Sequence, residues 1–206
     1  HDTKLDFNST SFSHPKSGNL SLSNPDESIR SFWVEHTRRC RDIADAMGKA
    51  QNDPCIMNVW VHDGCKDVSV NHMLYRETLK KSLDEIFAEK KEWMKDCIEG
   101  KVFGMGLESF TVGSHDFYTA YAAKNNMMLT IDTGHYHPTE VPGDKVSAVL
   151  QFAYQIRKIG RIVYEIHEFA IGERGLVVWH LTEGNMYGVT VQSQQANDFR
   201  HFCLIY

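Results

Sequence analysis

The chain has 206 residues, of which 42% are hydrophobic, 24% charged and 11% aromatic, a composition typical of a globular domain and not of a fibrous or disordered chain. No apolar run approaches the roughly 18 residues of a membrane-spanning helix, so we expect no membrane partner. The formal net charge of −5 argues against a nucleic-acid partner. Five cysteines without a Cys-x-x-Cys pair, beside 11 histidines, favour a reducing, cytoplasmic location over a disulfide scaffold.

The first helix is the most clearly indicated element. Asn24 is a suitable cap, Pro25 suits the first helical position, and Asp26 and Glu27 favour the positive end of the helix dipole. A stripe at helical spacing follows, formed by Ile29, Phe32, Trp33, His36, Cys40, Ile43 and Met47. We expect this stripe to face the core.

The remaining periodicity of the first 150 residues predicts three more helices and four strands. Helical spacing predicts Arg76–Asp96, Asp116–Lys124 and Asp144–Lys158. Short apolar segments, typical of strands buried on both faces, predict Thr3–Asn8, Ile56–His62, Lys101–Met105 and Met128–Ile131. The alternation of strands and helices favours parallel pairing and an α/β architecture.

The fold class predicted from this order is a partial (β/α)8 barrel of TIM type with about four βα units. An open doubly wound sheet is the alternative, although no strand is followed by a glycine-rich nucleotide-binding loop. The pattern changes near residue 150, after which there is no proline. Strand signals without helices then predict hairpins, at Arg161–Ile166, Leu176–Leu181, Tyr187–Val191 and Phe202–Tyr206. We therefore predict a barrel segment over residues 1–150 and a separate strand-rich tail over 151–206.

The strongest candidate site follows the strand that ends near Ile131. Asp132, His135 and His137 place three potential metal ligands within six residues, and carboxylate and imidazole are good ligands for Mn, Zn or Fe. On an extended backbone the two histidines would face the same side. The alternative is a capping aspartate with two surface histidines.

Two further positions lie at strand ends or starts. Glu99 and Lys101 are two residues apart, so on a strand they would point the same way, and an ammonium beside a carboxylate can stabilise a developing oxyanion. An exposed, salt-linked pair is the alternative. Trp60 can form a wall of a sugar site, since sugar C–H faces stack on aromatic rings, or it can be a core tryptophan.

Four separate segments carry a resemblance to a known family, namely LDFNSTSFSHP, NVWVHDGCKDVSV, EGKVFGMGLESFTVGSHDFY and IDTGHYHPTEV. Together they span about residues 4–150, in order and with compatible spacing, and they resemble L-rhamnose isomerase. The resemblance implies a TIM barrel with two divalent metals, usually Mn²⁺, and a homotetramer. The implied reaction is the interconversion of L-rhamnose and L-rhamnulose by a metal-assisted hydride shift.

The resemblance also implies roles for particular residues. Glu99 and Asp132 are similar to ligands of the structural metal, and His135 is similar to a ligand of the catalytic metal. Lys101 resembles the family's lysine near the sugar oxygens, and Trp60 resembles an aromatic wall of the sugar pocket. No role is implied for His137.

The resemblance ends near residue 150. The family continues with a metal-binding histidine and an Asp-x-Asp-His run, but Asp198 is the only aspartate after residue 150. We interpret the chain as an internal segment of a rhamnose isomerase joined to a tail that is unrelated or translated in another frame, and we expect its catalysis to be deficient. The alternatives are a metal-dependent hydrolase that uses His135 and His137, and a non-enzymatic binding module.

Overall fold

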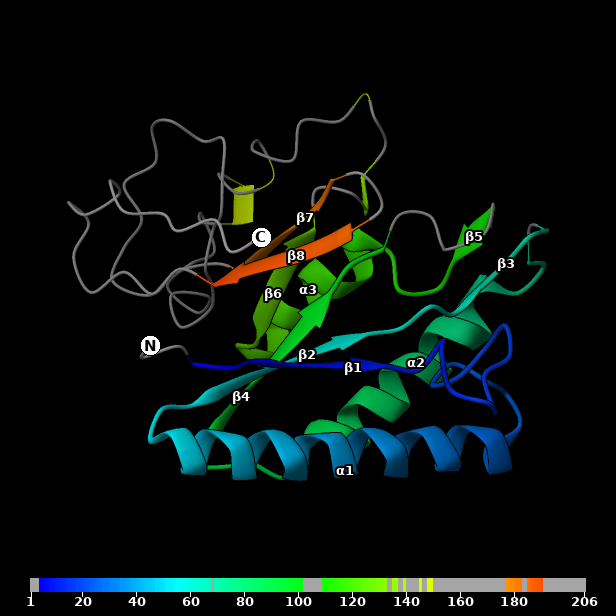
Figure 1. Ribbon diagram of the computed structural model, residues 1–206. Helices are drawn as coiled ribbons and strands as arrows, with labels where there is room; N and C mark the ends of the chain where they lie inside the picture. The colour runs from blue at the N-terminus through cyan, green and yellow to red at the C-terminus, as the bar shows by residue number, and fades with distance from the viewer. Residues whose placement is uncertain are drawn as a thin grey trace.

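The computed structural model describes residues 4–67, 69–101, 109–132, 135–136, 139, 145, 148–149, 177–182 and 185–190. Six strands of these residues form one sheet (Figure 1), namely β1 (Phe7–Thr10), β2 (Cys55–Trp60), β4 (Met94–Glu99), β6 (Met128–Asp132), β7 (Val177–Thr182) and β8 (Asn185–Thr190). The short strands β3 (Gly64–Cys65) and β5 (Phe110–Thr111) pair separately as an antiparallel ribbon. The helices are α1 (Glu27–Gln51), α2 (His72–Phe87) and α3 (His115–Asn125).

The strands of the large sheet follow one another in chain order. Each pair from β1 to β7 is parallel, and only β7 and β8 are antiparallel. A doubly wound sheet reverses its order at a switch point, and there is no such reversal among the described strands β1, β2, β4 and β6. The predicted α/β class with parallel pairing is confirmed, and the order fits a segment of a barrel, whose closure stays a prediction.

The N-cap of helix α1 lies two residues after the predicted cap. Asp26, not Asn24, is the N-cap, and its carboxylate accepts hydrogen bonds from the backbone N–H groups of Ser28 and Ile29. The buried face also differs from the predicted stripe. Trp33 and Cys40 are buried as expected, but two members of the stripe, Ile29 and Ile43, are exposed. The sequence prediction was wrong there because two arginines take the inward positions.

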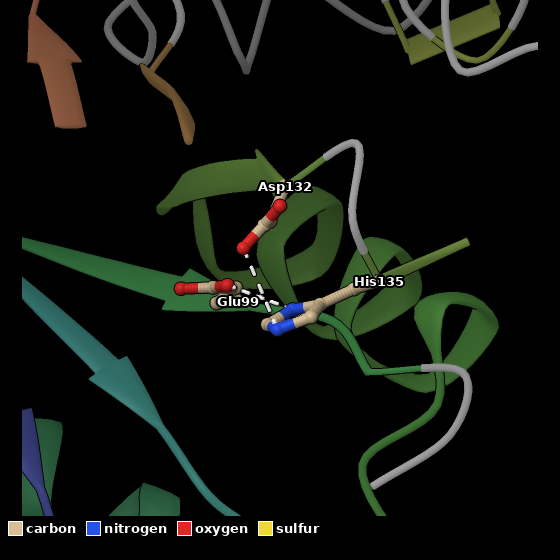
Figure 2. A group of neighbouring side chains, drawn as sticks. All are labelled: Glu99, Asp132 and His135. Atoms are coloured by element: carbon tan, nitrogen blue, oxygen red, sulfur yellow. Dashed lines mark ion pairs between the residues drawn. The ribbon is translucent and has the colours of Figure 1, made fainter. Parts of the chain in front are cut away.

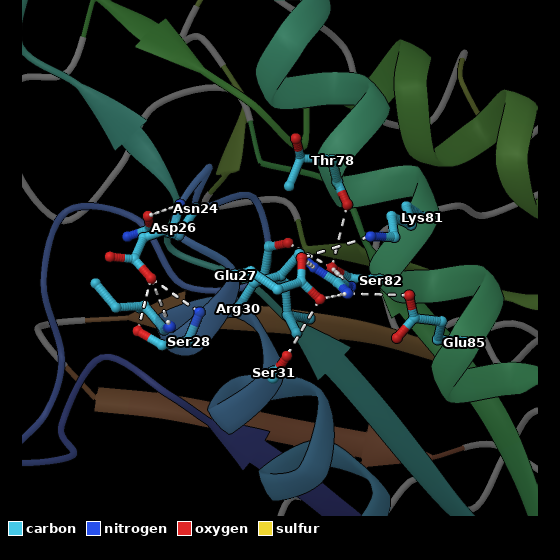
Figure 3. Close-up of polar contacts among 12 residues, drawn as sticks. Asn24, Asp26, Glu27, Ser28, Arg30, Ser31, Thr78, Lys81, Ser82 and Glu85 are labelled. Carbon is cyan, nitrogen blue, oxygen red and sulfur yellow. Dashed lines mark hydrogen bonds and ion pairs between the residues drawn. The ribbon is translucent and has the colours of Figure 1, made fainter.

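Arg30 is one of these arginines, and it joins α1 to α2 (Figure 3). Its guanidinium pairs with Glu27 at 2.6 Å and with Glu85 at 3.0 Å, and it donates a hydrogen bond to Ser82. Ser82 in turn donates to the carbonyl of Leu22. A charged side chain can occupy a core position when it is paired and hydrogen-bonded in this way.

The second arginine explains the largest error in the predicted elements. Helix α2 ends at Phe87, and residues 94–96 belong to β4 rather than to the predicted helix Arg76–Asp96. Arg41 donates to the carbonyls of Ile86 and Glu89 and pairs with Asp96. It therefore satisfies the carbonyl groups at the end of α2, a contact distant in sequence that local periodicity does not reveal.

The remaining predicted elements are found with shifted ends or lie outside the described residues. Strands β1, β2 and β6 and helix α3 overlap their predicted ranges, and β7 and β8 form a hairpin within the predicted strand-rich tail. The predicted strand Lys101–Met105 is wrong at its start. The observed strand, β4, ends at Glu99, and Lys101 lies beyond it. Outside the described residues lie 102–108, most of the predicted helix Asp144–Lys158, and the predicted strands Arg161–Ile166 and Phe202–Tyr206.

The core lies where α1, α2 and α3 pack on the sheet. All residues of β2 and β6 are buried, as expected of strands covered on both faces. Trp33 and Phe87 belong to this core, which confirms their predicted burial. Among the described helices, none has the length and apolar character needed to cross a bilayer.

Candidate metal centre

The candidate site lies at the carboxyl-terminal edge of the parallel strands. Trp60 is the last residue of β2, Glu99 the last of β4, and Asp132 the last of β6. Parallel strands end at the same edge, so side chains far apart in sequence meet there. His135 follows β6 by three residues and turns back toward both carboxylates (Figure 2).

Glu99, Asp132 and His135 form a cluster with the geometry of a metal site. One potential ligand atom from each residue lies within 4.8 Å of the others. His135 Nδ1 is 2.9 Å from Glu99 Oε1, and His135 Nε2 is 3.4 Å from Asp132 Oδ2. Two carboxylates with one imidazole form a donor set that suits Mn²⁺, Zn²⁺ or Fe²⁺. The residues present therefore fit a divalent cation.

The carboxylates of this cluster are buried, where a charge costs free energy unless an opposite charge is near it. The side chains of Glu99 and Asp132 are 4% and 0% exposed, and that of His135 is 19% exposed. Burial acts to lower the pKa of His135, but the hydrogen bond to Glu99 and the charges of Glu99 and Asp132 outweigh it and raise that pKa above its ordinary value. A buried pair of carboxylates attracts positive charge, which a bound cation supplies.

Lys101 is fully buried beside this cluster. Its backbone N–H donates to the carbonyl of Gly113, and its Nζ donates to the carbonyl of His62 at 2.6 Å. The ammonium also lies 5.5 Å from the centre of the Trp60 ring. Lys101 is held two residues beyond the end of β4, so the expectation of an exposed surface pair does not apply.

Trp60 connects Lys101 to the cluster. Its ring stacks on that of His135 with the centroids 5.8 Å apart, and Phe12 meets it edge-on at 5.0 Å. The indole is mostly buried. All five residues that the sequence singled out thus lie at one edge of the sheet, while His137 is outside the described residues.

Sequence reasoning missed the residues that hold these groups in place. Asn58 Nδ2 donates to Glu99 Oε2 at 2.5 Å, and Thr130 Oγ1 donates to Asn58 Oδ1 at 2.9 Å. Both residues are buried. The available signal was a polar residue inside an otherwise apolar strand, two positions before the strand end.

A second support holds the segment that carries His135. The hydroxyl of Tyr136 lies 2.7 Å from His115 Nδ1, at the start of α3. The backbone of His115 in turn packs on Gly100, where an added Cβ would come within 2.9 Å of His115 Cα. Glycine between Glu99 and Lys101 therefore allows α3 to approach the sheet edge closely.

A carboxylate–imidazole cluster at the carboxyl ends of parallel strands is typical of α/β enzymes that bind a metal at this edge. Comparison with known families makes this class specific. Residues 1–163 match the family described as L-rhamnose isomerase (RhaA). The chain belongs to the L-rhamnose isomerase family.

Relatives named L-rhamnose isomerase support the same assignment. The protein of Bacteroides thetaiotaomicron is 67% identical over 156 residues, which are 76% of this chain and 37% of that protein. The protein of Mannheimia succiniciproducens is 47% identical over 154 residues, 74% of this chain and 37% of that protein. The chain thus spans about 37% of the length of these curated relatives, and its residues 164–206 lie outside the family match.

Proposed function

We propose that this chain carries part of the active site of an aldose–ketose isomerase that interconverts L-rhamnose and L-rhamnulose. The observation that carries the proposal is the cluster of Glu99, Asp132 and His135 at the sheet edge of a family member. Family membership favours isomerisation over the two alternatives, a metal-dependent hydrolase and a binding module.

The proposed cofactor is Mn²⁺, with two divalent metals in the complete site; Glu99 and Asp132 would be ligands of the structural metal and His135 a ligand of the catalytic metal. When bound, a divalent cation of this kind supplies polarisation of the sugar oxygens at C1 and C2. The two carboxylates provide hard oxygen donors, and the imidazole provides a borderline nitrogen donor. A complete site of the implied two-metal type needs further ligands from outside this cluster.

Lys101 and Trp60 are proposed to act on the sugar. The Lys101 ammonium is held by the His62 carbonyl and lies over the Trp60 ring. In this position its positive charge would stabilise negative charge developing on a sugar oxygen. Trp60 would supply an apolar wall next to His135, against which sugar C–H groups can pack.

The whole protein is proposed to be cytoplasmic and to assemble as a homotetramer, as the family resemblance implies. The location is supported by the cysteines of the described residues, since Cys40, Cys55, Cys65 and Cys97 are all free thiols. The proposed small-molecule partner is the sugar.

The metal site is tested on the full chain by titration with Mn²⁺, using the loss of the free-ion electron paramagnetic resonance signal as the readout. Glu99→Gln and Asp132→Asn keep the side-chain shapes, and His135→Gln removes the imidazole. Each is expected to weaken binding by more than the roughly 100-fold that loss of an outer hydrogen-bond partner costs. Glu35→Gln, on the exposed face of α1, is the matched control. Equal affinity in all variants would contradict the ligand assignment.

The reaction is tested in the longer Bacteroides thetaiotaomicron relative, by replacing its matching segment with residues 4–150 of this chain. We expect this exchanged protein to convert L-rhamnose to L-rhamnulose with Mn²⁺, and Lys101→Met to abolish conversion while Mn²⁺ binding persists. A folded, Mn²⁺-binding exchanged protein with no activity would overturn the proposed reaction.

A further inference from the structure

A second layer of buried polar side chains lies directly beneath the candidate metal centre. Asn58, Cys97 and Thr130 each stand two residues before the ends of β2, β4 and β6, which are Trp60, Glu99 and Asp132. Because side chains alternate along a strand, each member of the lower layer faces the same side as the residue above it.

This lower layer is unusual for the interior of a parallel α/β sheet, where bulky branched residues dominate. Asn58 is 3% exposed, Thr130 1% and Cys97 0%. Burial of an amide or hydroxyl costs free energy unless its hydrogen bonds are made. Here the three residues bond to one another and to Glu99, which lies opposite Thr130 in the register of β4 and β6.

The direction of these hydrogen bonds follows from chemistry. The amide nitrogen Nδ2 is the donor of the Asn58 side chain, and it is directed at Glu99 Oε2. The Asn58 Oδ1 atom therefore faces Thr130, whose single hydroxyl hydrogen is donated to it. Thr130 Oγ1 then accepts from the Cys97 thiol, which lies 2.9 Å away.

We propose, resting on the metal centre of the proposed function, that Cys97, Thr130 and Asn58 form a one-way hydrogen-bond relay that fixes Glu99 as a single-oxygen metal ligand. The relay holds Oε2, while Oε1 faces the cluster 2.9 Å from His135 Nδ1. Asn58 and Thr130 are thus positioning residues. Because the relay fixes the amide from both ends, Asn58 cannot rotate to present its oxygen to Glu99.

The relay is tested on the full chain with Mn²⁺ alone as the probe. Thr130→Val removes the hydroxyl but keeps the side-chain shape, and we expect Mn²⁺ affinity to fall about 10-fold. Asn58→Ala should lower it by roughly 10- to 100-fold. The double variant should lose no more than Asn58→Ala, because Thr130 acts only through the amide, and Thr130→Ser should restore most of the affinity.

A matched control separates positioning from stability. Thr37 is also buried, and its hydroxyl donates within α1, to the carbonyl of Trp33. Thr37→Val should keep the wild-type Mn²⁺ affinity even if it lowers the unfolding temperature. As a second readout, the visible absorption spectrum of the Co²⁺-loaded chain should change in Thr130→Val, because freeing Glu99 Oε2 alters the coordination, and should not change in Thr37→Val.

The outcomes distinguish the relay from the site that it serves. If wild type binds Mn²⁺ and Thr130→Val has the same affinity and Co²⁺ spectrum, the relay is overturned while the metal centre stands. If Thr130→Val does not fold, Thr130→Ala removes the same hydroxyl with less crowding and carries the same expectation. A wild-type chain that fails to bind Mn²⁺ overturns the proposed metal centre and the relay with it.

Discussion

Two clusters of buried charge, one beneath helix α1 and one at the sheet edge, differ in how they are balanced. Arg41 is 1% exposed, and its guanidinium meets both oxygens of Asp96 and the carbonyls of Ile86 and Glu89. At the sheet edge, two carboxylates meet one imidazole. In the first cluster the positive charge of Arg41 is paired with the negative charge of Asp96. The second cluster concentrates negative charge that a cation can neutralise.

This difference separates a structural role from a binding role. An ion pair whose donors are directed at acceptors within the fold has a structural role, and its removal is expected to affect folding. A cluster with excess buried charge is a candidate site because its charge must be neutralised by something that binds. The following changes test that distinction.

Arg41→Met should produce the largest loss of stability. It leaves the mostly buried carboxylate of Asp96 without its guanidinium partner, and it removes the donors to the carbonyls of Ile86 and Glu89, so we expect a loss of about 3–5 kcal/mol in the free energy of unfolding. Urea denaturation measures this. Arg39→Met is the matched control, because Arg39 is exposed and pairs with exposed Glu35, and it should change stability by less than about 1 kcal/mol. Equal losses of stability in Arg41→Met and Arg39→Met would contradict a structural role for Arg41.

Metal should stabilise the chain only through the second cluster. At Mn²⁺ concentrations about 100 times the dissociation constant, the free energy of unfolding of wild type should rise by about 2.7 kcal/mol. Thermal unfolding with and without Mn²⁺ measures this. Asp132→Asn should lose the increase, whereas Asp42→Asn, on the exposed side of α1, should keep it. An increase that persists in Asp132→Asn would place the metal elsewhere.

Two glycines that lie in close contact with the backbone of another segment allow the structural region and the metal centre to be compared again, with smaller expected losses of stability. A Cβ on Gly100 would come within 2.9 Å of His115 Cα, and one on Gly48 would meet the carbonyl oxygen of Trp93. Both alanine variants should lose stability, for Gly100→Ala by about 1–3 kcal/mol, as measured by urea denaturation. Only Gly100→Ala should also weaken Mn²⁺ binding, since Gly100 adjoins Glu99. Gly18→Ala is the control, because there is open space around its Cβ. A loss of Mn²⁺ affinity in Gly48→Ala would contradict the distinction between a structural contact at Gly48 and a contact that supports the metal centre at Gly100.

The sequence predicted the strand ends that form the site better than it predicted the helix faces. Asp132 and His135 were found because they follow an apolar strand, at the edge where the ends of parallel strands are expected to meet. Glu99 was expected before a strand at Lys101–Met105, and only the family resemblance implied a ligand role for it, whereas the structure has it at the end of β4. The inward arginines of α1 were missed because their partners, Asp96 and Glu85, come from other elements. The hydrophobic periodicity of one segment gives no information about partners on other elements.

The end of α2 and the relay beneath the site escaped prediction for the same physical reason. In the segment from Met94 to Glu99, the charges of Lys95 and Asp96 resemble the polar face of a helix, although Asp96 is paired with Arg41. Asn58 is a single polar residue in an apolar strand, and only the position of Glu99 in three dimensions gives it a role. Contacts between elements, not local preferences, decide these features.

The cap of α1 offers the smallest effect and a test by pH. The pKa of Asp26 is lowered below 3.8, first by the hydrogen bond from the Ser28 hydroxyl and then by those from the N–H groups of Ser28 and Ile29. A carboxyl with a lowered folded-state pKa contributes stability that is present above its unfolded pKa and is lost as pH falls through the folded pKa.

Asp26→Asn keeps a capping oxygen but does not titrate. The unfolding temperature of wild type should therefore exceed that of Asp26→Asn near neutral pH, and this difference should shrink as pH falls below about 3.8. Asn24→Ala, at the position that sequence alone indicated as the cap, should show no such pH-dependent difference. A constant difference for Asp26→Asn across the same pH range would mean that the carboxylate charge adds nothing to the cap.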